Sequence, residues 1–272
     1  MTSRLPRMVT VIQARCGSSR LPGKVLLPLA GKPLLVRMVE RVKAATFAGT
    51  VVVATTTLRE DNAIDDLCQR EGFSCFRGHV RDLLDRHYQA GLRERAEAVV
   101  KIPSDCPLID PGVIDRVLAF YAEIPGRFDY VSNLHPPTYP DGNDVEVMSW
   151  PALALAWQEA RRDYEREHTT PFFWDHPERF RIGNVVWETC LDYSMTHRWT
   201  IDYEEDYRFI KAVYDGLYNR DPLFGIDDIL NLLHERGDMA VINSRHVGVN
   251  WYRHHLGHLR TVGPERTRVT HD

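Results

Sequence analysis

A cluster of positive charge follows the first apolar run of the chain. Val9–Ala14 is typical of a buried strand. The loop after it combines three cations with small side chains: Arg15, Gly17, Ser18, Arg20 and Lys24. Backbone N–H groups approach an anion closely only where side chains are small, and a triphosphate needs positive charge from several directions. The loop is therefore expected to bind a nucleotide, with Gly17 and Ser18 as backbone donors.

This loop matches neither of the two common glycine-rich phosphate loops. A Walker A loop requires Gly-x-x-x-x-Gly-Lys-Ser/Thr, whereas five residues separate Gly17 from Gly23 and Val25 follows Lys24. A dinucleotide fingerprint requires Gly-x-Gly-x-x-Gly, whereas Ser-Ser-Arg follows Gly17. A merely solvated surface loop is the remaining alternative, and the position of the cations directly after a strand argues against it.

Two aspartates follow predicted strands and are candidates for a metal site. Asp105 lies just beyond Ala98–Ile102, and Asp202 lies just beyond His197–Ile201. Open α/β sheets present their ligands at this end of the strands, and Mg²⁺ is usually held by one or two carboxylates together with substrate phosphate. The alternative is that both aspartates cap a turn or a helix.

The elements that must position these residues alternate between strands and helices. In the first half, strands are predicted at Val9–Ala14, Thr50–Thr55, Phe73–Phe76 and Ala98–Ile102, and helices at Asn62–Arg70, at Arg81–Arg95, from Pro33 and from Pro111 after an Asp110 cap. In the second half, strands are predicted at Asp129–Ser132, Val145–Met148, Arg181–Glu188 and His197–Ile201, and helices from Pro151, at Tyr203–Tyr218 and at Ile226–Glu235. This alternation predicts an α/β fold with a mostly parallel sheet flanked by helices.

Composition excludes several classes of protein. The net charge is −4 and the isoelectric point is near 6.3, so no general basic surface is expected and nucleic acid is not an expected partner. The five cysteines are scattered and never spaced as Cys-x-x-Cys, which indicates a reduced, cytoplasmic protein rather than a disulfide framework. The apolar run Met8–Ile12 is too short for a signal segment or a membrane span.

A long motif resembles a known family. Ile12–Lys24, continued by Gly31–Leu34, is similar to the opening signature of sugar-acid cytidylyltransferases, closest to the spore-coat-polysaccharide (SpsF-type) branch and similar to CMP-KDO and CMP-sialate synthetases. Further motifs follow in the order of that branch: Arg77-Gly78, Leu84-Asp85-Arg86, Ser104–Asp110, Asp141–Glu146, Arg166–Pro171, Asp202 with Glu205-Asp206, and Ile242-Asn243. The resemblance implies a Rossmann-like GT-A-type nucleotidyltransferase fold, transfer of CMP from CTP to a small anionic sugar-like acceptor, a Mg²⁺ cofactor and a homodimer.

Roles follow for individual residues. The catalytic set is Arg15, Lys24, Asp105 and Asp202, of which Asp105 and Asp202 would hold the metal. The nucleotide-binding set adds Ala14, Gly17, Ser18, Arg20, Arg77 and Ser104, with Arg77 a candidate contact of the base. The acceptor-binding set is Asp141, Asp144, Glu146, Arg166 and His168; alternation predicts that Asp144 and Glu146 share one face of a strand. Asn143 stands where the branch leads us to expect an apolar residue, so the acceptor pocket is expected to differ.

One domain is expected over residues 8–260, with a CTP-binding half (8–125), an acceptor-side and dimerisation half (126–260), and flexible termini at 1–7 and 261–272. The aromatic stretch Pro171–Trp174 either packs on the sheet or forms a dimer contact. Two alternative functions stay open: a nucleotidyltransferase acting on a phosphate- or phosphonate-bearing acceptor, and a catalytically silent nucleotide-binding subunit.

Overall fold

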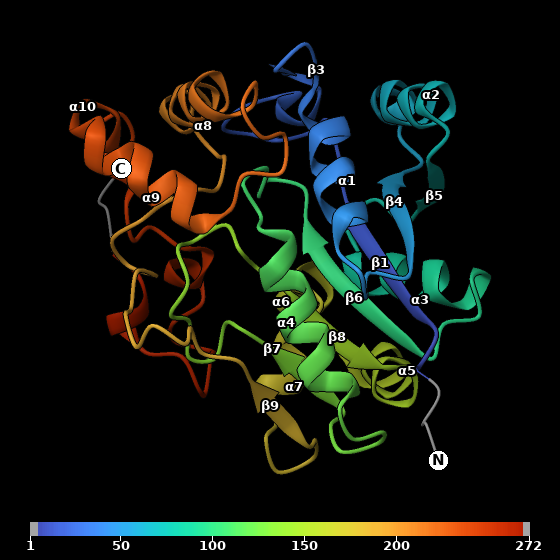
Figure 1. The fold of residues 1–272 in the computed structure, drawn as a ribbon. Helices are drawn as coiled ribbons and strands as arrows, with labels where there is room; N and C mark the ends of the chain where they lie inside the picture. The colour runs from blue at the N-terminus through green and yellow to red at the C-terminus, as the bar shows by residue number, and fades with distance from the viewer. Residues whose placement is uncertain (1–4, 269–272) are drawn as a thin grey trace.

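A single mixed sheet forms the centre of the molecule (Figure 1). The computed structural model describes residues 5–268, and within them seven strands follow the order β5-β4-β1-β6-β8-β7-β9. The strands are β1 (Met8–Gln13), β4 (Thr50–Thr56), β5 (Ser74–Gly78), β6 (Ala98–Pro103), β7 (Tyr130–Ser132), β8 (Glu146–Ser149) and β9 (Ile182–Asn184). The first four in this order are parallel, and β8 runs antiparallel to both of its neighbours. The predicted fold class is confirmed.

Helices cover both faces of this sheet (Figure 1). They are α1 (Leu34–Ala44), α2 (Asn62–Glu71), α3 (Leu83–Arg93), α4 (Pro111–Ala122), α5 (Trp150–Glu159), α6 (Asp163–His168), α7 (Pro171–Trp174), α8 (Glu204–Leu217), α9 (Ile226–Glu235) and α10 (Gly237–Ala240). Because side chains alternate along β1, Met8 and Ile12 join one core with α1 and α4, whereas Val9 and Val11 join the other with α3 and α5. Parallel strands buried on both faces explain the continuous apolar runs of the sequence.

Short elements complete the chain. A two-stranded hairpin, β2 (Pro28–Leu29) and β3 (Lys32–Pro33), precedes α1. Because Pro33 pairs in this hairpin with an extended ψ of 144°, α1 begins at Leu34, and Pro33 is the N-cap rather than the first helical residue. The single-turn 3₁₀ helices are η1 (Lys24–Leu26), η2 (Arg59–Asp61), η3 (Ser244–His246), η4 (Trp251–His254) and η5 (Pro264–Arg266).

The strand predicted at His197–Ile201 is wrong. Within it only Arg198 forms a bridge, to Asp141. The segment instead runs against Gly142, where the backbone of Trp199 would lie 2.7 Å from a Cβ atom, so this crossing requires glycine. The strand predicted at Arg181–Glu188 is also shorter, because only β9 pairs with β7.

Residues 261–268, part of the tail expected to be flexible, make contacts with the folded core. The buried carboxylate of Asp175 accepts hydrogen bonds from the backbone N–H groups of Arg260 (2.7 Å) and Thr261 (3.0 Å). Val262 is buried in the core cluster that also contains Trp174 and Tyr252. The polar composition of this stretch concealed these anchors. Residues 1–4 and 269–272, also expected to be flexible, lie outside the described residues.

The aromatic segment α7 packs inward. Its rings are buried, and Phe173 stacks on Tyr130 of β7 with centroids 5.4 Å apart. Of the two alternatives from the sequence, packing on the sheet or a dimer contact, the structure shows packing on the sheet.

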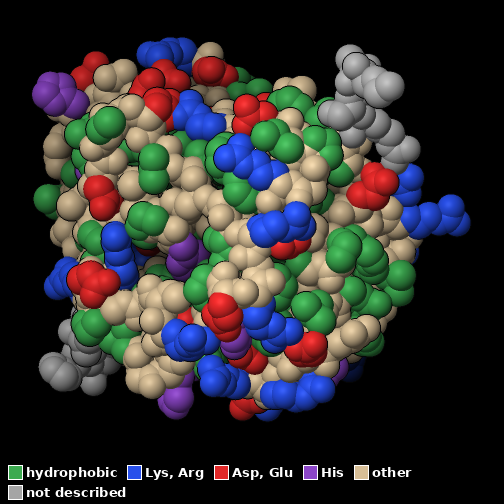
Figure 2. Space-filling model, turned by 90° about the horizontal axis from the view of Figure 1, so that it is seen from below, with side chains coloured by type: hydrophobic (Ala, Val, Ile, Leu, Met, Phe, Trp, Pro, Cys, Tyr) green, Lys and Arg blue, Asp and Glu red, His purple; other side chains and the backbone are tan. Residues whose placement is uncertain are grey.

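On the face shown in Figure 2, basic and acidic side chains intermingle. None of the helices within residues 5–268 is long and apolar enough to cross a bilayer.

Arg41 on α1 illustrates what joins the helices on one face. Its side chain is 1% exposed, and its guanidinium donates to the carbonyl oxygens of Ile109 (2.8 Å) and Phe224 (2.7 Å). These acceptors precede α4 and α9, so one cation ties three helices together. We predict that Arg41→Ala lowers the free energy of unfolding by about 2–4 kcal/mol, because buried carbonyl groups lose their donors. Urea unfolding measures this, and exposed Arg70→Ala is the control; equal stability of the two variants would contradict the prediction.

His87 on α3 gives the fold a defined pH dependence. It is fully buried, and burial lowers its pKa to about 3, although Nδ1 lies 2.7 Å from the carbonyl oxygen of Leu83. Since the unfolded chain binds this proton near pH 6.5 and the folded chain does not, its contribution is complete above pH 6.5 and is lost as pH falls toward 3.

We predict that wild-type protein loses about 2 kcal/mol more unfolding free energy between pH 6.5 and pH 5 than His87→Leu does. Urea titrations at the two pH values measure the difference. Exposed His234→Gln serves as the control and should follow the wild type. Parallel losses in wild type and His87→Leu would show that His87 does not titrate in this way.

Candidate active site

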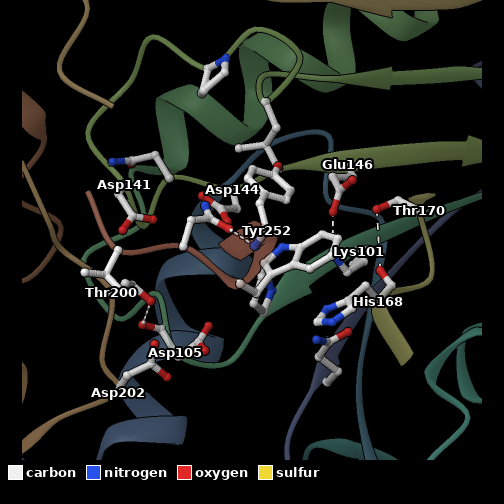
Figure 3. Close-up of a pocket in the computed structure, with 18 of the residues that line it drawn as sticks. Lys101, Asp105, Asp141, Asp144, Glu146, His168, Thr170, Thr200, Asp202 and Tyr252 are labelled. Carbon is white, nitrogen blue, oxygen red and sulfur yellow. Dashed lines mark hydrogen bonds and ion pairs between the residues drawn. The ribbon is translucent and has the colours of Figure 1, made fainter. Parts of the chain in front are cut away.

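A cavity of about 550 Å³ opens where β1 and β6 end. Seven segments line it: the loop after β1, the start of α3, β6 and its end, residues 133–146, the α6–α7 region, residues 194–202 and residues 248–266. Figure 3 shows carboxylates on one side, with Asp105, Asp141 and Asp202 together, and Lys101, Glu146 and His168 on the other. The cavity therefore has two sides of different chemistry.

Lys24 is the centre of the acidic side. Its Nζ donates to Asp105 Oδ2 and Asp202 Oδ1, each at 3.1 Å, and to the carbonyl oxygen of Ile201 at 2.6 Å. Burial alone would lower the pKa of Lys24, but the two carboxylates outweigh it and raise this pKa. The same attraction lowers the pKa of Asp202, against its own burial. An ammonium ion thus stands where two carboxylates converge.

A buried network fixes the orientation of Asp202. Arg198 is 3% exposed and donates to Asp202 Oδ2 (3.1 Å), to both oxygens of Asp206 and to Asp141 Oδ2 (3.4 Å). Asp206 in turn accepts from the backbone N–H groups of Asp202 and Tyr203, just before α8, and from the side chain of Asn243. The contact of Arg198 with Asp202 Oδ2 leaves Asp202 Oδ1 directed at Lys24.

A contact with η2 and a hydrogen bond within the loop fix the conformation of the loop after β1. The N–H of Cys16 donates to Asp61 Oδ1 at 2.7 Å, and Gly23 closes the loop by donating to the carbonyl of Cys16 at 2.9 Å. Gly23 has a φ of 69°, the left-handed region, which turns the chain into η1 and directs Lys24 inward. The N–H of Ser18 also donates to Cys16 O, so this predicted phosphate donor already has a partner within the loop.

The predicted nucleotide-binding residues divide between the cavity and its surroundings. Those that line the cavity are Ala14, Arg15, Ser18, Arg20, Lys24, Ser104 and Asp105. Arg15 is exposed, and Arg20 pairs with Asp202 at 2.8 Å. Gly17 and Arg77 are absent from the described residues that line it. Arg77 instead donates to the carbonyl oxygens of Thr56 and Leu58, so it supports the β4–η2 connection.

Asp141 and Asp144 lie in the cavity without a full set of partners. Burial, followed by the neighbouring carboxylates, raises the pKa of Asp141 to about 8 and that of Asp144 to about 6. Arg198 opposes this shift at Asp141, and Lys101 opposes it at Asp144. Carboxylates in this setting favour a cation or the hydroxyl donors of a ligand.

Glu146 differs from its predicted partner. It opens β8, whereas Asp144 precedes the strand. Glu146 is 1% exposed, forms an ion pair with Lys101 of β6 and accepts from Tyr130 Oη at 2.5 Å. Its charge is therefore neutralised within the fold, so Glu146 forms part of the cavity wall and offers little free negative charge to a ligand.

Of the pair predicted from α6, His168 lines the cavity. Burial lowers the pKa of His168 to about 3, and its ring stacks on Trp251 with centroids 3.8 Å apart. Arg166 is absent from the described lining residues and pairs with Asp82 at the start of α3. Arg166 thus joins α6 to α3, and His168 presents an uncharged ring.

Several lining residues were given no site role in the sequence analysis, although Gln13 and Arg86 lie within its motifs. They are Gln13, Arg86, Lys101, Asn133, Arg198, Trp251, Tyr252 and Arg266. Lys101 carried a signal, since a lysine inside an apolar parallel strand requires a buried partner. Asn143, noted as unusual, is buried and accepts a hydrogen bond from the N–H of Asp110, so it ties the lining loop to the cap of α4.

The residues present fit a divalent cation. Asp105 and Asp202 direct carboxylate oxygens at one point, and oxygen donors are what Mg²⁺ prefers. Within residues 5–268, no group of three or more acidic, histidine or cysteine side chains forms a metal site by itself. Two carboxylates completed by substrate oxygens match the usual way in which magnesium is held beside a nucleotide.

Comparison with known proteins identifies the family. Residues 9–226 match the family model described as cytidylyltransferase. The chain is 30% identical to the spore coat polysaccharide biosynthesis protein SpsF of Bacillus subtilis over 235 residues, which cover 85% of this chain and 95% of that protein. It is 34% identical to the mitochondrial 3-deoxy-manno-octulosonate cytidylyltransferase of Arabidopsis thaliana over 225 residues, 77% of this chain and 73% of that protein.

A solved structure agrees with these relatives. The cytidylyltransferase of Leptospira borgpetersenii superposes with a TM-score of 0.81 at 31% identity, covering 86% of this chain and 97% of that chain. The cavity wall formed by residues 248–266 lies beyond the part that the family model matches. The matched part contains the loop after β1, Asp105 and Asp202. The chain therefore belongs to the sugar-acid cytidylyltransferase family of CTP-dependent nucleotidyltransferases.

Proposed function

We propose that this protein transfers CMP from CTP to a sugar acid of the ulosonate or nonulosonate kind and releases pyrophosphate. The observation that carries the proposal is the convergence of Lys24, Asp105 and Asp202 beside the cationic loop. The acceptor oxygen forms a bond to the α-phosphorus while the bond from that phosphorus to the pyrophosphate oxygen breaks. Charge grows on the leaving group, and cations fixed in advance stabilise it.

In this proposal the loop binds the triphosphate. Arg15 is exposed at the start of the loop, whereas Arg20 lies beside Asp202 on the acidic side of the cavity. The two guanidinium groups would therefore contact phosphate oxygens from two directions. Asp105 and Asp202 would hold Mg²⁺, which neutralises phosphate charge and lowers the pKa of the acceptor hydroxyl when bound.

Lys24 has a double role in this scheme. Without nucleotide its ammonium offsets the repulsion between Asp105 and Asp202. Asp105 and Asp202 would hold the metal through the same carboxylate oxygens that Lys24 contacts, so Lys24 would then be free to reach phosphate oxygens. The flexible four-carbon stem of lysine permits this movement.

The acceptor would lie between the carboxylates and the aromatic wall. Asp141 and Asp144 can accept hydrogen bonds from sugar hydroxyls. Trp251 and Tyr252 of η4 and Trp174 of α7 offer flat apolar surfaces to a sugar ring, and His168 is uncharged. The names of the relatives, SpsF and 3-deoxy-manno-octulosonate cytidylyltransferase, support an acceptor of this chemistry.

A homodimer and a cytoplasmic location stay predictions from the sequence. Light scattering at micromolar protein concentration tests the dimer.

The second candidate function is CMP transfer to a phosphate- or phosphonate-bearing acceptor, because the loop and Arg266 bring several cations to the cavity.

We predict that Asp105→Asn lowers CTP turnover about 100-fold or more while the protein stays folded, because the metal loses one of its two ligands. Pyrophosphate release with CTP and Mg²⁺ measures turnover, and removal of Mg²⁺ with EDTA should abolish it. Exposed Asp227→Asn is the control. A variant at Asp105 that keeps the wild-type rate would contradict the assignment.

We predict that a panel of ulosonic acids, phosphosugars and phosphonates gives pyrophosphate release only with a ulosonic or nonulosonic acid. Mass spectrometry of the CMP product identifies the acceptor. Turnover with a phosphonate alone would favour the second candidate. Absence of release with every acceptor would favour the catalytically silent subunit.

A further inference from the structure

A second cavity of about 340 Å³, here named the side cavity, adjoins the candidate active site. The two cavities have several lining residues in common, among them His135, Trp174 and Tyr252. The rest of the side cavity is lined mainly by apolar residues, which are Pro136, Pro177, Ile182 and Val262. Because the same rings border both spaces, a molecule bound in the active site can extend a substituent into the side cavity.

Three aromatic rings form this border, and they contact one another. The ring centroids of His135 and Trp174 are 4.5 Å apart, those of Trp174 and Tyr252 are 6.2 Å apart, and those of His135 and Tyr252 are 6.3 Å apart. Burial raises the pKa of Tyr252 well above its ordinary value, and the nearby carboxylates of Glu146 and Asp144 raise it further. A sugar acid beside these carboxylates would therefore meet the three rings at the entrance to the side cavity.

The hydrogen-bonding groups of two of these rings are uncharged and have no partner. Burial lowers the pKa of His135 to about 4, so at neutral pH its imidazole offers one N–H donor and one acceptor. Within residues 5–268 neither ring nitrogen of His135 has a hydrogen-bond partner, since only its backbone N–H donates, to Asn184. The Nε1 of Trp174 is buried and also lacks a partner among the described residues. This border therefore favours an uncharged group that both accepts and donates hydrogen bonds.

An acylamido group has this chemistry. Its carbonyl oxygen accepts, its N–H donates, and its alkyl end is apolar like the lining of the side cavity. A methyl group attached directly to the sugar would leave the donors of His135 and Trp174 unpaired. An anion would face the carboxylate of Glu265, and Arg266 already lies 3.8 Å from a carboxylate oxygen of Asp192.

We propose that the side cavity receives the N-acyl group of an acylamido sugar acid, with His135 and Trp174 in contact with its amide. This inference rests on the proposed function, and it narrows the acceptor from sugar acids in general to those that carry an N-acyl substituent.

The C-terminal segment supplies much of this selectivity. Tyr252 and Val262 both lie beyond residues 9–226, the part that the family model matches. The backbone N–H of Thr261 donates to Asp175, next to Trp174, which fixes this segment against α7. The side cavity is thus formed where the C-terminal segment folds back over the shared fold.

Titration calorimetry of the full chain, with CTP and EDTA present so that no transfer occurs, tests the proposal. The two probes are N-acetylneuraminic acid and its analogue with a hydroxyl group in place of the acetamido group. Wild type should bind the acetamido acid about tenfold or more tightly than the analogue, because the alkyl end is buried and the amide is hydrogen-bonded.

Variants that fill the side cavity should remove this preference. In Val262→Phe it should fall to about twofold or less, because Val262 lines the side cavity but not the larger one. Ile182→Phe fills the cavity from β9 and should have the same effect, which keeps the test decisive where circular dichroism shows that Val262→Phe is unfolded. Exposed Val241→Phe is the matched control and should behave as wild type.

Equal affinity of wild type for the two acids, or binding of neither, would overturn the proposal, and so would an unchanged preference in the folded filling variants. Pyrophosphate release with CTP and Mg²⁺ separates these results from the proposed function. Equal release with both acids would support CMP transfer and overturn the role of the side cavity. A binding preference for the acetamido acid without release from any sugar acid would support the side cavity and overturn CMP transfer.

Discussion

One buried ammonium group joins the parts of the chain that build the site. Lys24 belongs to the loop after β1, Asp105 to the end of β6, and Asp202 to the segment before α8. The backbone reinforces the junction, because the carbonyl of Asp105 accepts from Ile201 N–H and Thr200 Oγ1. Two carboxylates placed this close repel each other, so without a cation they would move apart or take up a proton. The geometry of the acidic side therefore depends on Lys24.

The remainder of the cavity follows from how the second half of the chain returns to the sheet. Arg198 and Asp206 orient Asp202, and Gly142 lets the chain cross the backbone of Trp199. The other side is closed by the stack of His168 on Trp251, which brings α6 and the C-terminal segment together. Charge gathers where phosphate chemistry would occur, and flat uncharged rings gather where a sugar ring would bind.

The sequence predicted what depends on local pattern. Residue types and spacing were enough for the strand before the loop, for Asp105 beyond β6 and for the Asp110 cap of α4, whose Oδ1 accepts from Gly112 N–H. Partners far apart in the chain were beyond that reach. The ion pair of Glu146 with Lys101, 45 positions away, and that of Arg166 with Asp82, 84 positions away, could not be predicted from local pattern. The wall at residues 248–266 was missed because its polar composition hides the packing of Tyr252 and Val262.

The most direct test of this account is manganese binding in the absence of nucleotide, followed by electron paramagnetic resonance in wild type and Lys24→Met. If the ammonium of Lys24 holds the place of the metal, the variant should bind Mn²⁺ about tenfold or more tightly than wild type, because two carboxylates then converge with no competing cation. Circular dichroism confirms that the variant is folded. Equal Mn²⁺ affinity in the two proteins would contradict the account, since Lys24 would then not occupy the metal position.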